Sequence, residues 1–275
     1  MKTSIIICSY GGKEDLVERC IGSLKCQTCQ PDEVILVVDT EEEKESYSNL
    51  LYGIRVVPMK VICSGRRGLA AARNRGIEAS IGDIIAFIDD DAVADENWLY
   101  EIVNSFDSEN VMVVGGPVEP IFRGKKIKEK LNWIVGCTSN NPSTKRPIGC
   151  NMAIHRGVFN TMGVFNENLG RVKERLSIGE ETELFLRIKK YKPNAEIIYN
   201  RNAVVFHEAP AHRTKLGYML RRAYEEGLTK AVIGKKYGME VEQDYLKYYV
   251  KHLDLTTFVV LFSIVIGYIR GKFRR

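Results

Sequence analysis

The sequence of 275 residues predicts an α/β fold, a mostly parallel twisted sheet flanked by helices. Two observations support this prediction. Short runs rich in Ile and Val alternate with segments whose apolar residues recur at helical spacing, which is the rhythm of βαβ units. The apolar runs are also nearly continuous, and such strands are typical of parallel sheets that helices cover on both faces.

The predicted strands of the first half end at polar residues. They are Ser4–Cys8, Glu33–Val38, Arg55–Ile62, Asp83–Ile88 and Val111–Gly115, with helices expected at Lys13–Lys25 and Gly68–Ala79. In open parallel sheets, ligands bind beyond the carboxyl ends of the strands. The residues at those ends are Ser9 and Tyr10, Asp39, and Asp89 to Asp91, so we expect the site there.

The second half has a weaker pattern. From about Pro117 to Asn200 we expect loops rich in Gly, Pro and Asn, with one helix at Glu180–Lys190. We interpret this region as the acceptor side of the site, built onto the same sheet. An amphipathic helix is expected at Lys215–Tyr237, because its apolar and charged residues fall on opposite sides.

The segment Leu255–Ile269 is apolar on every face of a helix, and a basic tail, Arg270–Arg275, follows it. At about 1.5 Å per residue the helix reaches roughly 22 Å, which is shorter than the roughly 30 Å hydrocarbon core. An interfacial or re-entrant anchor therefore fits better than a spanning helix. Anionic lipid of the cytoplasmic leaflet would attract the tail. The alternative is a core helix that packs on its own domain or on a dimer partner.

Composition excludes several classes of protein. The hydrophobic share of 45% and charged share of 27% are those of a globular protein. The net charge of +5 is modest, and basic residues are not interleaved with aromatic ones, so no nucleic-acid partner is expected. The seven cysteines favour reduced thiols over a disulfide framework. Cys26 and Cys29 form a C-x-x-C pair without the second pair that a structural zinc site needs.

Three consecutive acids, Asp89, Asp90 and Asp91, end a buried strand. Adjacent negative charges repel one another unless a cation neutralises them, and carboxylate oxygens are ligands that Mg²⁺ or Mn²⁺ prefers. Residues i and i+2 of an extended chain point to the same side, so Asp89 and Asp91 can serve one ligand. The alternative is an acidic turn or a helix cap.

A second group of acids, Glu180, Glu181 and Glu183, lies at the start of a predicted helix. Helix capping alone could explain it, because negative charge is favourable near a helix N-terminus. A carboxylate held beside a metal-bound donor would also suit general-base catalysis on an acceptor hydroxyl.

Several motifs follow one another in a specific order over residues 4–231. They are Ile5–Tyr10, Gln27-Thr28, Pro31–Asp39, Gly68–Gly76, Asp89–Asp91, Gly149–Ala153, Gly163–Glu167, Gly179–Arg187 and Val204–His207. Together they resemble the family 2 glycosyltransferases, which are inverting enzymes with the GT-A fold. The resemblance implies a GT-A type sheet flanked by helices, followed by C-terminal amphipathic and apolar helices.

The resemblance also implies domain boundaries. Residues 1–213 would form the glycosyltransferase domain, with 1–116 as the nucleotide-sugar-binding half and 117–213 as the acceptor-binding half. Residues 214–275 would form a helical segment that associates with the membrane.

The resemblance implies a role for each matching residue. The nucleotide sugar would be bound by Ser9, Tyr10, Asp39, Arg73, Asp89 and Asp90, and the metal by Asp91 and His207. The acceptor side would include Asn151 and Glu180, and the catalytic base would be Glu181. Asp39 would accept a hydrogen bond from the nucleotide base. Arg73 would hold the donor phosphates or orient the Asp-rich motif. The cofactor implied is Mg²⁺ or Mn²⁺.

The chain departs from the family pattern at two places. Thr40–Lys44 replaces the Asp and the Gly-Ser-Thr turn that often follow the position of Asp39 in the family. This difference leaves open which nucleotide base the site prefers. Glu181 stands where the family usually has Asp, and one added methylene moves a carboxylate by about 1.5 Å, enough to lower a rate by about a hundredfold. Glu180 or Glu183 is the alternative base.

We therefore expect an inverting glycosyltransferase that moves a sugar from a nucleotide diphosphate donor to an acceptor hydroxyl in lipid-linked glycan or surface polysaccharide assembly. It would act at the cytoplasmic face of the cell membrane, held by the C-terminal helix and basic tail. The alternatives are a sugar nucleotidyltransferase, for which Gly11-Gly12-Lys13 is a faint phosphate loop, and a non-catalytic membrane-bound nucleotide-binding protein.

Overall fold

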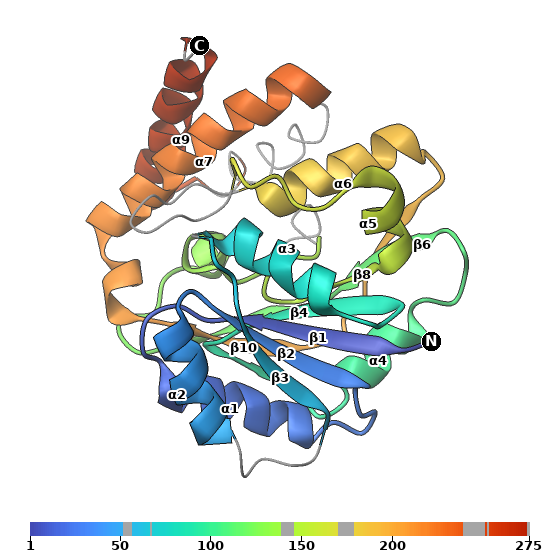
Figure 1. Cartoon of the computed structure of the whole chain (residues 1–275). Helices are drawn as coiled ribbons and strands as arrows, with labels where there is room; N and C mark the ends of the chain where they lie inside the picture. Colours follow the sequence, from blue (N-terminus) through green and yellow to red (C-terminus); the bar gives the residue numbers. More distant parts are fainter. Residues whose placement is uncertain are drawn as a thin grey trace.

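The computed structural model describes residues 1–51, 57–66, 68–138, 146–169, 179–238, 251 and 253–273. These residues form a seven-stranded sheet and a three-stranded sheet. Figure 1 shows the helices around them. The α/β class and the mostly parallel sheet flanked by helices are confirmed.

The main sheet has the strand order β3-β2-β1-β4-β8-β6-β9. Its strands are β1 (Thr3–Cys8), β2 (Glu33–Val38), β3 (Met59–Cys63), β4 (Ile84–Asp89), β6 (Val111–Gly115), β8 (Met152–His155) and β9 (Glu196–Tyr199). β1 lies between β2 and β4 and is parallel to both, with Ile6 opposite Ile35 and Phe87. β8 is antiparallel to both of its neighbours. The carboxyl ends of β1, β2 and β4 therefore meet at one edge.

Helices cover both faces of this sheet, because successive strand residues point to opposite sides. Ile5 and Ile7 pack with helices α1 (Glu14–Lys25), α2 (Glu41–Leu51) and α4 (Trp98–Asn104). Ile6 packs on the other face with α3 (Leu69–Ala79), α5 (Arg156–Met162) and α6 (Glu180–Tyr191). Figure 1 shows the sheet between these two layers. Burial on both faces explains why the strand sequences are apolar without alternation.

The first strand of the smaller sheet follows directly in sequence after the acids at the end of β4. Its strands are β5 (Ala92–Ala94), β10 (Val205–Ala209) and β7 (Val118–Phe122), in the order β5-β10-β7. β5 is antiparallel to β10, with His207 opposite Ala92. Since Ala92 follows Asp91, this register brings a histidine from late in the chain beside the acids.

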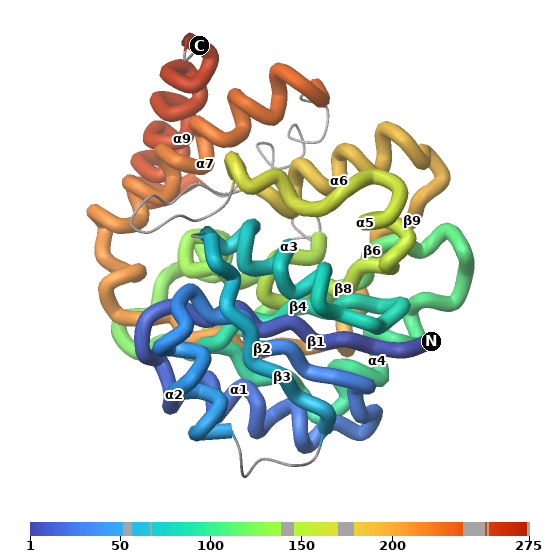
Figure 2. Tube along the Cα trace, in the orientation of Figure 1, coloured from blue at the N-terminus to red at the C-terminus, as the bar shows by residue number. Residues whose placement is uncertain are grey.

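The C-terminal helices α7 (Leu216–Tyr237) and α9 (Leu255–Phe273) cross at very close range. A Cβ atom on Gly227 would collide with the Ile264 carbonyl oxygen, and one on Gly267 would collide with that of Tyr224. The Ser263 hydroxyl also donates to the Leu220 carbonyl oxygen at 2.8 Å. Figure 2 shows the two helices beside each other at one end of the molecule. Glycine at these positions allows the two backbones to approach.

Helix α9 is buried on one side only. The side that faces α7 carries Thr257, Val260, Ile264, Gly267 and Gly271. The large apolar residues of the opposite side are exposed, namely Leu255, Phe258, Phe262, Val265, Ile266, Ile269 and Phe273. Among the described residues, α9 is the one helix long and apolar enough to cross a membrane by length and composition.

The predicted end of this helix at Ile269 was too early, because the helix continues through the basic residues Arg270 and Lys272 to Phe273. Its 19 residues extend about 28 Å, close to the roughly 30 Å of a bilayer core. The sequence-based length of roughly 22 Å is thereby corrected.

Other predictions differ from the structure where the pattern is weak. The region 117–200 contains more regular structure than the one predicted helix, since it also includes β7, β8, α5 and β9. These elements are short, so each shows little periodicity. Helix α2 was not predicted because only Tyr47 and Leu51 of its residues are buried. The predicted strand Arg55–Ile62 begins partly outside the described residues, and β3 begins at Met59.

The division into domains at residues 116 and 213 stays a prediction. Strands β8 and β9, from the predicted acceptor half, lie in the same sheet as β1 to β4 of the nucleotide half.

Candidate active site

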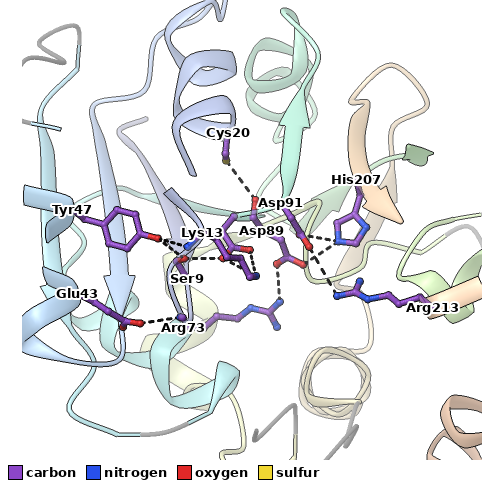
Figure 3. Close-up of polar contacts among 12 residues, drawn as sticks. Ser9, Lys13, Cys20, Glu43, Tyr47, Arg73, Asp89, Asp91, His207 and Arg213 are labelled. Carbon is purple, nitrogen blue, oxygen red and sulfur yellow. Dashed lines mark hydrogen bonds and ion pairs between the residues drawn. The ribbon is translucent and has the colours of Figure 1, made fainter. Parts of the chain in front are cut away.

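The three acids at the end of β4 make contacts in two directions, and Figure 3 shows Asp89 and Asp91 beside His207. Asp90 is buried and accepts hydrogen bonds from Ser9 Oγ at 2.8 Å and from Lys13 Nζ at 2.9 Å. Asp89 and Asp91 both face His207, whose Nε2 lies 3.8 Å from Asp89 Oδ2 and 3.1 Å from Asp91 Oδ1. Asp90 and Asp91 form the turn between β4 and β5, so a turn, and not the expected alternation of an extended chain, places the first and third acids around one point.

The charges of His207 and Asp91 stabilise each other. Burial alone would lower the pKa of His207, but its hydrogen bonds with Asp91 and Cys137 and the negative charge of Asp91 together raise the pKa to about 10. Burial alone would raise the pKa of Asp91, whereas its hydrogen bond to His207 and the charges of Lys13 and Arg213 hold it well below its usual range. The pair is therefore a buried ion pair at neutral pH, and His207 supplies the positive charge that the acid requires.

Arg73, on α3, connects the acids of β4 to those of α6. Its Nη1 lies 3.0 Å from both Glu180 Oε1 and Glu181 Oε1, and its Nη2 lies 3.8 Å from Asp89 Oδ1. The side chain is only 3% exposed. Its guanidinium group also packs over the Phe165 ring, 5.8 Å from the centroid. One buried cation thus contacts three carboxylates from two segments of the chain.

The two acids that begin α6 have different surroundings. Glu180 is buried, and this burial together with the negative charge of Glu181 raises its pKa to about 7 despite the opposing effect of Arg73. The Glu181 side chain is 21% exposed and reaches solvent. Of the two, Glu181 is the carboxylate that an acceptor could contact.

Glu183 lies away from the site. Its carboxylate accepts hydrogen bonds from Tyr237 Oη at 2.5 Å and from Arg187 Nη2 at 2.9 Å. It therefore ties α6 to the end of α7, and the alternative that it serves as the base stays a prediction that these contacts do not support.

The ends of β1 and β2 form the predicted nucleotide end of the site. Ser9 is buried, Tyr10 is 60% exposed, and Asp39 is half-buried. Glu43 joins the two loops that follow these strands, because its carboxylate accepts hydrogen bonds from the backbone N–H groups of Gly11 at 2.9 Å and Asp39 at 3.0 Å. The loops are therefore held at a fixed separation.

Glu43 also explains the departure at Thr40–Lys44. Thr40 Oγ1 accepts the Glu43 N–H at 3.2 Å, and the Glu43 carboxylate accepts the Thr40 N–H at 3.3 Å. This reciprocal pair is a capping box, which begins α2 where the family often has a Gly-Ser-Thr turn.

Asn151 is fully buried behind the site. Its amide donates to the carbonyl oxygens of Pro117 and Ala203, both at 2.8 Å, and its Oδ1 accepts the Trp98 Nε1–H at 2.8 Å. These bonds join β8 to the loops before β7 and β10. A contact between Asn151 and an acceptor stays a prediction.

The structure adds residues that the sequence analysis did not assign to the site. Lys13 binds Asp90, and the faint Gly11-Gly12-Lys13 motif was its only signal. Arg213 Nη2 lies 4.0 Å from Asp91 Oδ2, and among the described residues its buried Nε has no hydrogen-bond partner. Cys150 also lies beside the acids. Neither Arg213 nor Cys150 stands in a motif whose spacing indicates a ligand.

The donor atoms present fit a divalent cation. Asp89, Cys150 and His207 each offer one ligand atom, and these atoms lie within 4.8 Å of one another. Asp91 Oδ1 adjoins the same imidazole nitrogen at 3.1 Å. A metal that displaces the Nε2 proton of His207 would find an imidazole nitrogen beside carboxylate oxygens, a donor set that suits Mn²⁺ and related cations.

Comparison with known proteins gives consistent results. Residues 4–163 match the model of the family described as glycosyl transferase family 2. A glucosyl-dolichyl phosphate glucuronosyltransferase of Haloferax volcanii is 28% identical over 261 residues, which cover 90% of this chain and 82% of that protein.

Two solved structures share the fold. The Pyrobaculum calidifontis mannosyltransferase PcManGT, in complex with GDP-Man and Mn²⁺, superposes with a TM-score of 0.65 at 16% identity and covers 97% of this chain and 73% of that one. Residues 1–349 of S. aureus TarS superpose with a TM-score of 0.60 at 16% identity and cover 98% of this chain and 81% of that one.

Proposed function

The chain belongs to glycosyltransferase family 2, and from this membership we propose that it transfers a sugar, with inversion, from a nucleotide diphosphate donor to an acceptor hydroxyl. We propose further that the acceptor belongs to a lipid-linked glycan or surface polysaccharide. The observation that carries the proposal is the convergence of Asp89, Glu180 and Glu181 on Arg73, because it sets the acids of the donor end beside a carboxylate suited to act as a base.

Glu181 is the proposed base. It accepts the proton of the acceptor hydroxyl while that oxygen forms a bond to the anomeric carbon and the bond from the anomeric carbon to the phosphate oxygen breaks. The electron pair of the broken bond leaves with the nucleoside diphosphate. Arg73 Nη1 lies 3.0 Å from Glu181 Oε1 and holds this carboxylate in place.

The leaving diphosphate gains negative charge and needs positive partners. A divalent cation held by Asp91 and His207, either Mg²⁺ or Mn²⁺, would stabilise that charge when bound. Arg213 supports the same role, since its guanidinium is largely buried, faces Asp91 and has an Nε–H without a partner among the described residues. Charge-assisted bonds from arginine to phosphate are strong, so Arg213 is suited to bind the diphosphate.

The nucleotide would occupy the end of the site between the β1 and β2 loops. Asp39 is proposed to accept a hydrogen bond from the base, and exposed Tyr10 to stack against it. Asp89 would contact the ribose or sugar. Ser9 and Lys13 hold Asp90 in place, so we propose that Asp90 orders the loop that binds the nucleotide.

The C-terminal helices support a membrane-bound acceptor. The exposed apolar side of α9 includes Phe258 and Phe262, and Arg270 and Lys272 follow at its end. Apolar residues that insert beside basic ones are typical of binding to anionic lipid surfaces. We propose that residues 214–275 bind the cytoplasmic face of the cell membrane, which would bring a lipid-linked acceptor to Glu181.

Product analysis tests the proposed reaction. The purified protein would be incubated with UDP-, GDP- and dTDP-sugars, Mn²⁺ and membrane lipid extract. Glycosyl transfer predicts release of free nucleoside diphosphate, whereas a nucleotidyltransferase would release pyrophosphate only in a parallel assay with a nucleoside triphosphate and a sugar 1-phosphate. If no donor yields nucleoside diphosphate above the level of Asp91→Ala, the proposal fails.

A further inference from the structure

Cys150 occupies a rigid position between the two halves of the site. It lies in the turn from Ile148 to Asn151, which the Asn151 N–H closes by donating to the Ile148 carbonyl oxygen at 2.8 Å. Three side-chain hydrogen bonds anchor Asn151, as described above. A Cβ atom on Gly149 would collide with Arg73 and Glu181. The turn therefore packs closely against Arg73 and Glu181, and the Cys150 thiol, which belongs to this turn, is held in place.

The Cys150 thiol lies near a carboxylate and an imidazole, which are two other kinds of metal ligand. The Cys150 sulfur, a carboxylate oxygen of Asp89 and a ring nitrogen of His207 lie within 4.8 Å of one another. Cys150 and His207 are buried, whereas the Asp89 side chain is 31% exposed. The group is thus closed by protein on the cysteine and histidine side and open toward the donor end on the aspartate side.

The other contacts of Cys150 and His207 point their ligand atoms toward the acids. The partner of the Cys150 thiol is the Gly136 carbonyl oxygen at 3.9 Å, which is a weak interaction. On the far side of the imidazole, His207 Nδ1 lies 3.8 Å from Cys137 Sγ, so that Nε2 faces the acids. A partner behind the imidazole is the usual support of a metal-binding histidine.

We propose that Cys150 Sγ is a ligand of the divalent cation, together with His207 and the carboxylates of Asp89 and Asp91. This inference rests on the metal site of the proposed function and adds the chemistry of its selectivity. Thiolate ligands favour the softer transition metals, and Mg²⁺ favours oxygen alone. The site therefore prefers Mn²⁺, Co²⁺, Zn²⁺ or Cd²⁺ to Mg²⁺, and the thiol releases its proton when the metal binds.

Cobalt absorption tests the ligand directly. The parent protein would carry Cys26→Ser and Cys29→Ser, which remove the C-x-x-C pair as a competing cobalt site. Co²⁺ would be added with UDP or with GDP. We expect visible cobalt bands and a near-ultraviolet band from charge transfer between thiolate and cobalt. Cys150→Ser should lose the charge-transfer band and keep the visible bands.

Cys20→Ser is the matched control. Cys20 is also buried beside the acids, but its thiol contacts the Asp89 carbonyl oxygen at 3.5 Å from the α1 side. This variant should keep both sets of bands. Loss of the charge-transfer band in Cys20→Ser but not in Cys150→Ser would overturn the assignment.

Two further outcomes separate this inference from the proposed function. Visible bands without charge transfer in the parent would overturn the role of Cys150 and leave the metal site intact. No cobalt spectrum in the parent, with either nucleotide, would overturn both. As a second measurement, Cys150→Ser should weaken Cd²⁺ binding at least about tenfold and change Mg²⁺ binding far less. Equal losses for the two metals would contradict the inference.

Discussion

Arg73 Nη1 lies 3.0 Å from Glu181 Oε1, although 108 positions separate the two residues in sequence. The contact joins α3, which packs on the parallel part of the sheet, to the start of α6. It also explains how an acid in the second half of the chain comes to lie beside the acids of β4. Arg73 is thus both a structural link and a part of the candidate active site.

Arg73→Ala is expected to destabilise the protein. The change leaves Glu180 buried without its cation, and breaking a buried ion pair by removing one partner costs about 3–5 kcal/mol. Urea denaturation at pH 7.5 measures the effect. Arg75→Ala, two residues further along the same helix, is the control because Arg75 is exposed and pairs with exposed Glu78. Equal stability of both variants would contradict the link.

Glu181→Gln should abolish transfer with the fold and nucleotide binding intact, because the amide cannot accept the acceptor proton. Glu181→Asp moves the carboxylate by about 1.5 Å and should lower kcat by about a hundredfold. Donor-dependent transfer assays at saturating donor test both changes. Glu183→Gln is the control, since Glu183 binds Tyr237 and Arg187. Substantial turnover by Glu181→Gln would remove Glu181 from the role of base.

Glu180 should make stability depend on pH. Its pKa is about 7 in the folded protein against an ordinary value of 4.5, so the folded state keeps a proton that the unfolded state releases between these values. Its contribution to the free energy of unfolding therefore falls as pH rises through this window. Glu180→Gln removes that contribution, so the stability of the variant relative to wild type should rise from pH 4.5 to 7 and then level off. A difference that stays constant with pH would refute this reasoning.

The sequence predicted β1, β2, β4 and β6 because their residues are uniformly apolar, and it missed α2, α4 and β5, which are short or little buried. β2 and β6 have the predicted bounds, and the carboxyl ends of β1, β2 and β4 bear the predicted polar residues. Full burial makes these strands apolar along their whole length, which is a strong local signal. The acid start of α6 was found for a similar reason, since its charges cluster over a few positions.

The remaining parts depend on contacts that no local pattern contains. His207 reaches the acids through the pairing of β10 with β5, a strand of three residues. Arg213 and Cys150 each stand alone in sequence, and only the fold shows that they face Asp91 and His207. Likewise, the close crossing of α7 and α9 follows from Gly227 and Gly267, which in sequence are ordinary helix-weakening residues.

The exposed side of α9 should bind membranes without being needed for the fold. A triple change, Phe258→Ser, Phe262→Ser and Ile266→Ser, alters exposed residues and spares Val260 and Ile264, which pack against α7. We expect the variant to keep its melting temperature and to lose cosedimentation with anionic liposomes, since each large apolar residue contributes about 1.5–3 kcal/mol when buried.

The matched control is Ile81→Ser, another exposed apolar residue that lies outside the C-terminal helices. It should cosediment like wild type. Deletion of 255–275 is a poorer test, because it also strips the buried contacts of Met219 and Ala223. A triple variant that cosediments as well as wild type would show that another surface binds the membrane.

The central claim is that the acids ending β4 bind a cation and, with it, the diphosphate of an activated sugar. Calorimetric titration with UDP-, GDP- and dTDP-sugars, in the presence and absence of Mn²⁺, tests this claim most directly, with exposed Asp107→Ala as the control for Asp91→Ala. The account predicts that at least one donor binds only with the metal, and that Asp91→Ala abolishes this binding while Asp107→Ala does not. Absence of binding for every donor, or unchanged binding by Asp91→Ala, would contradict it.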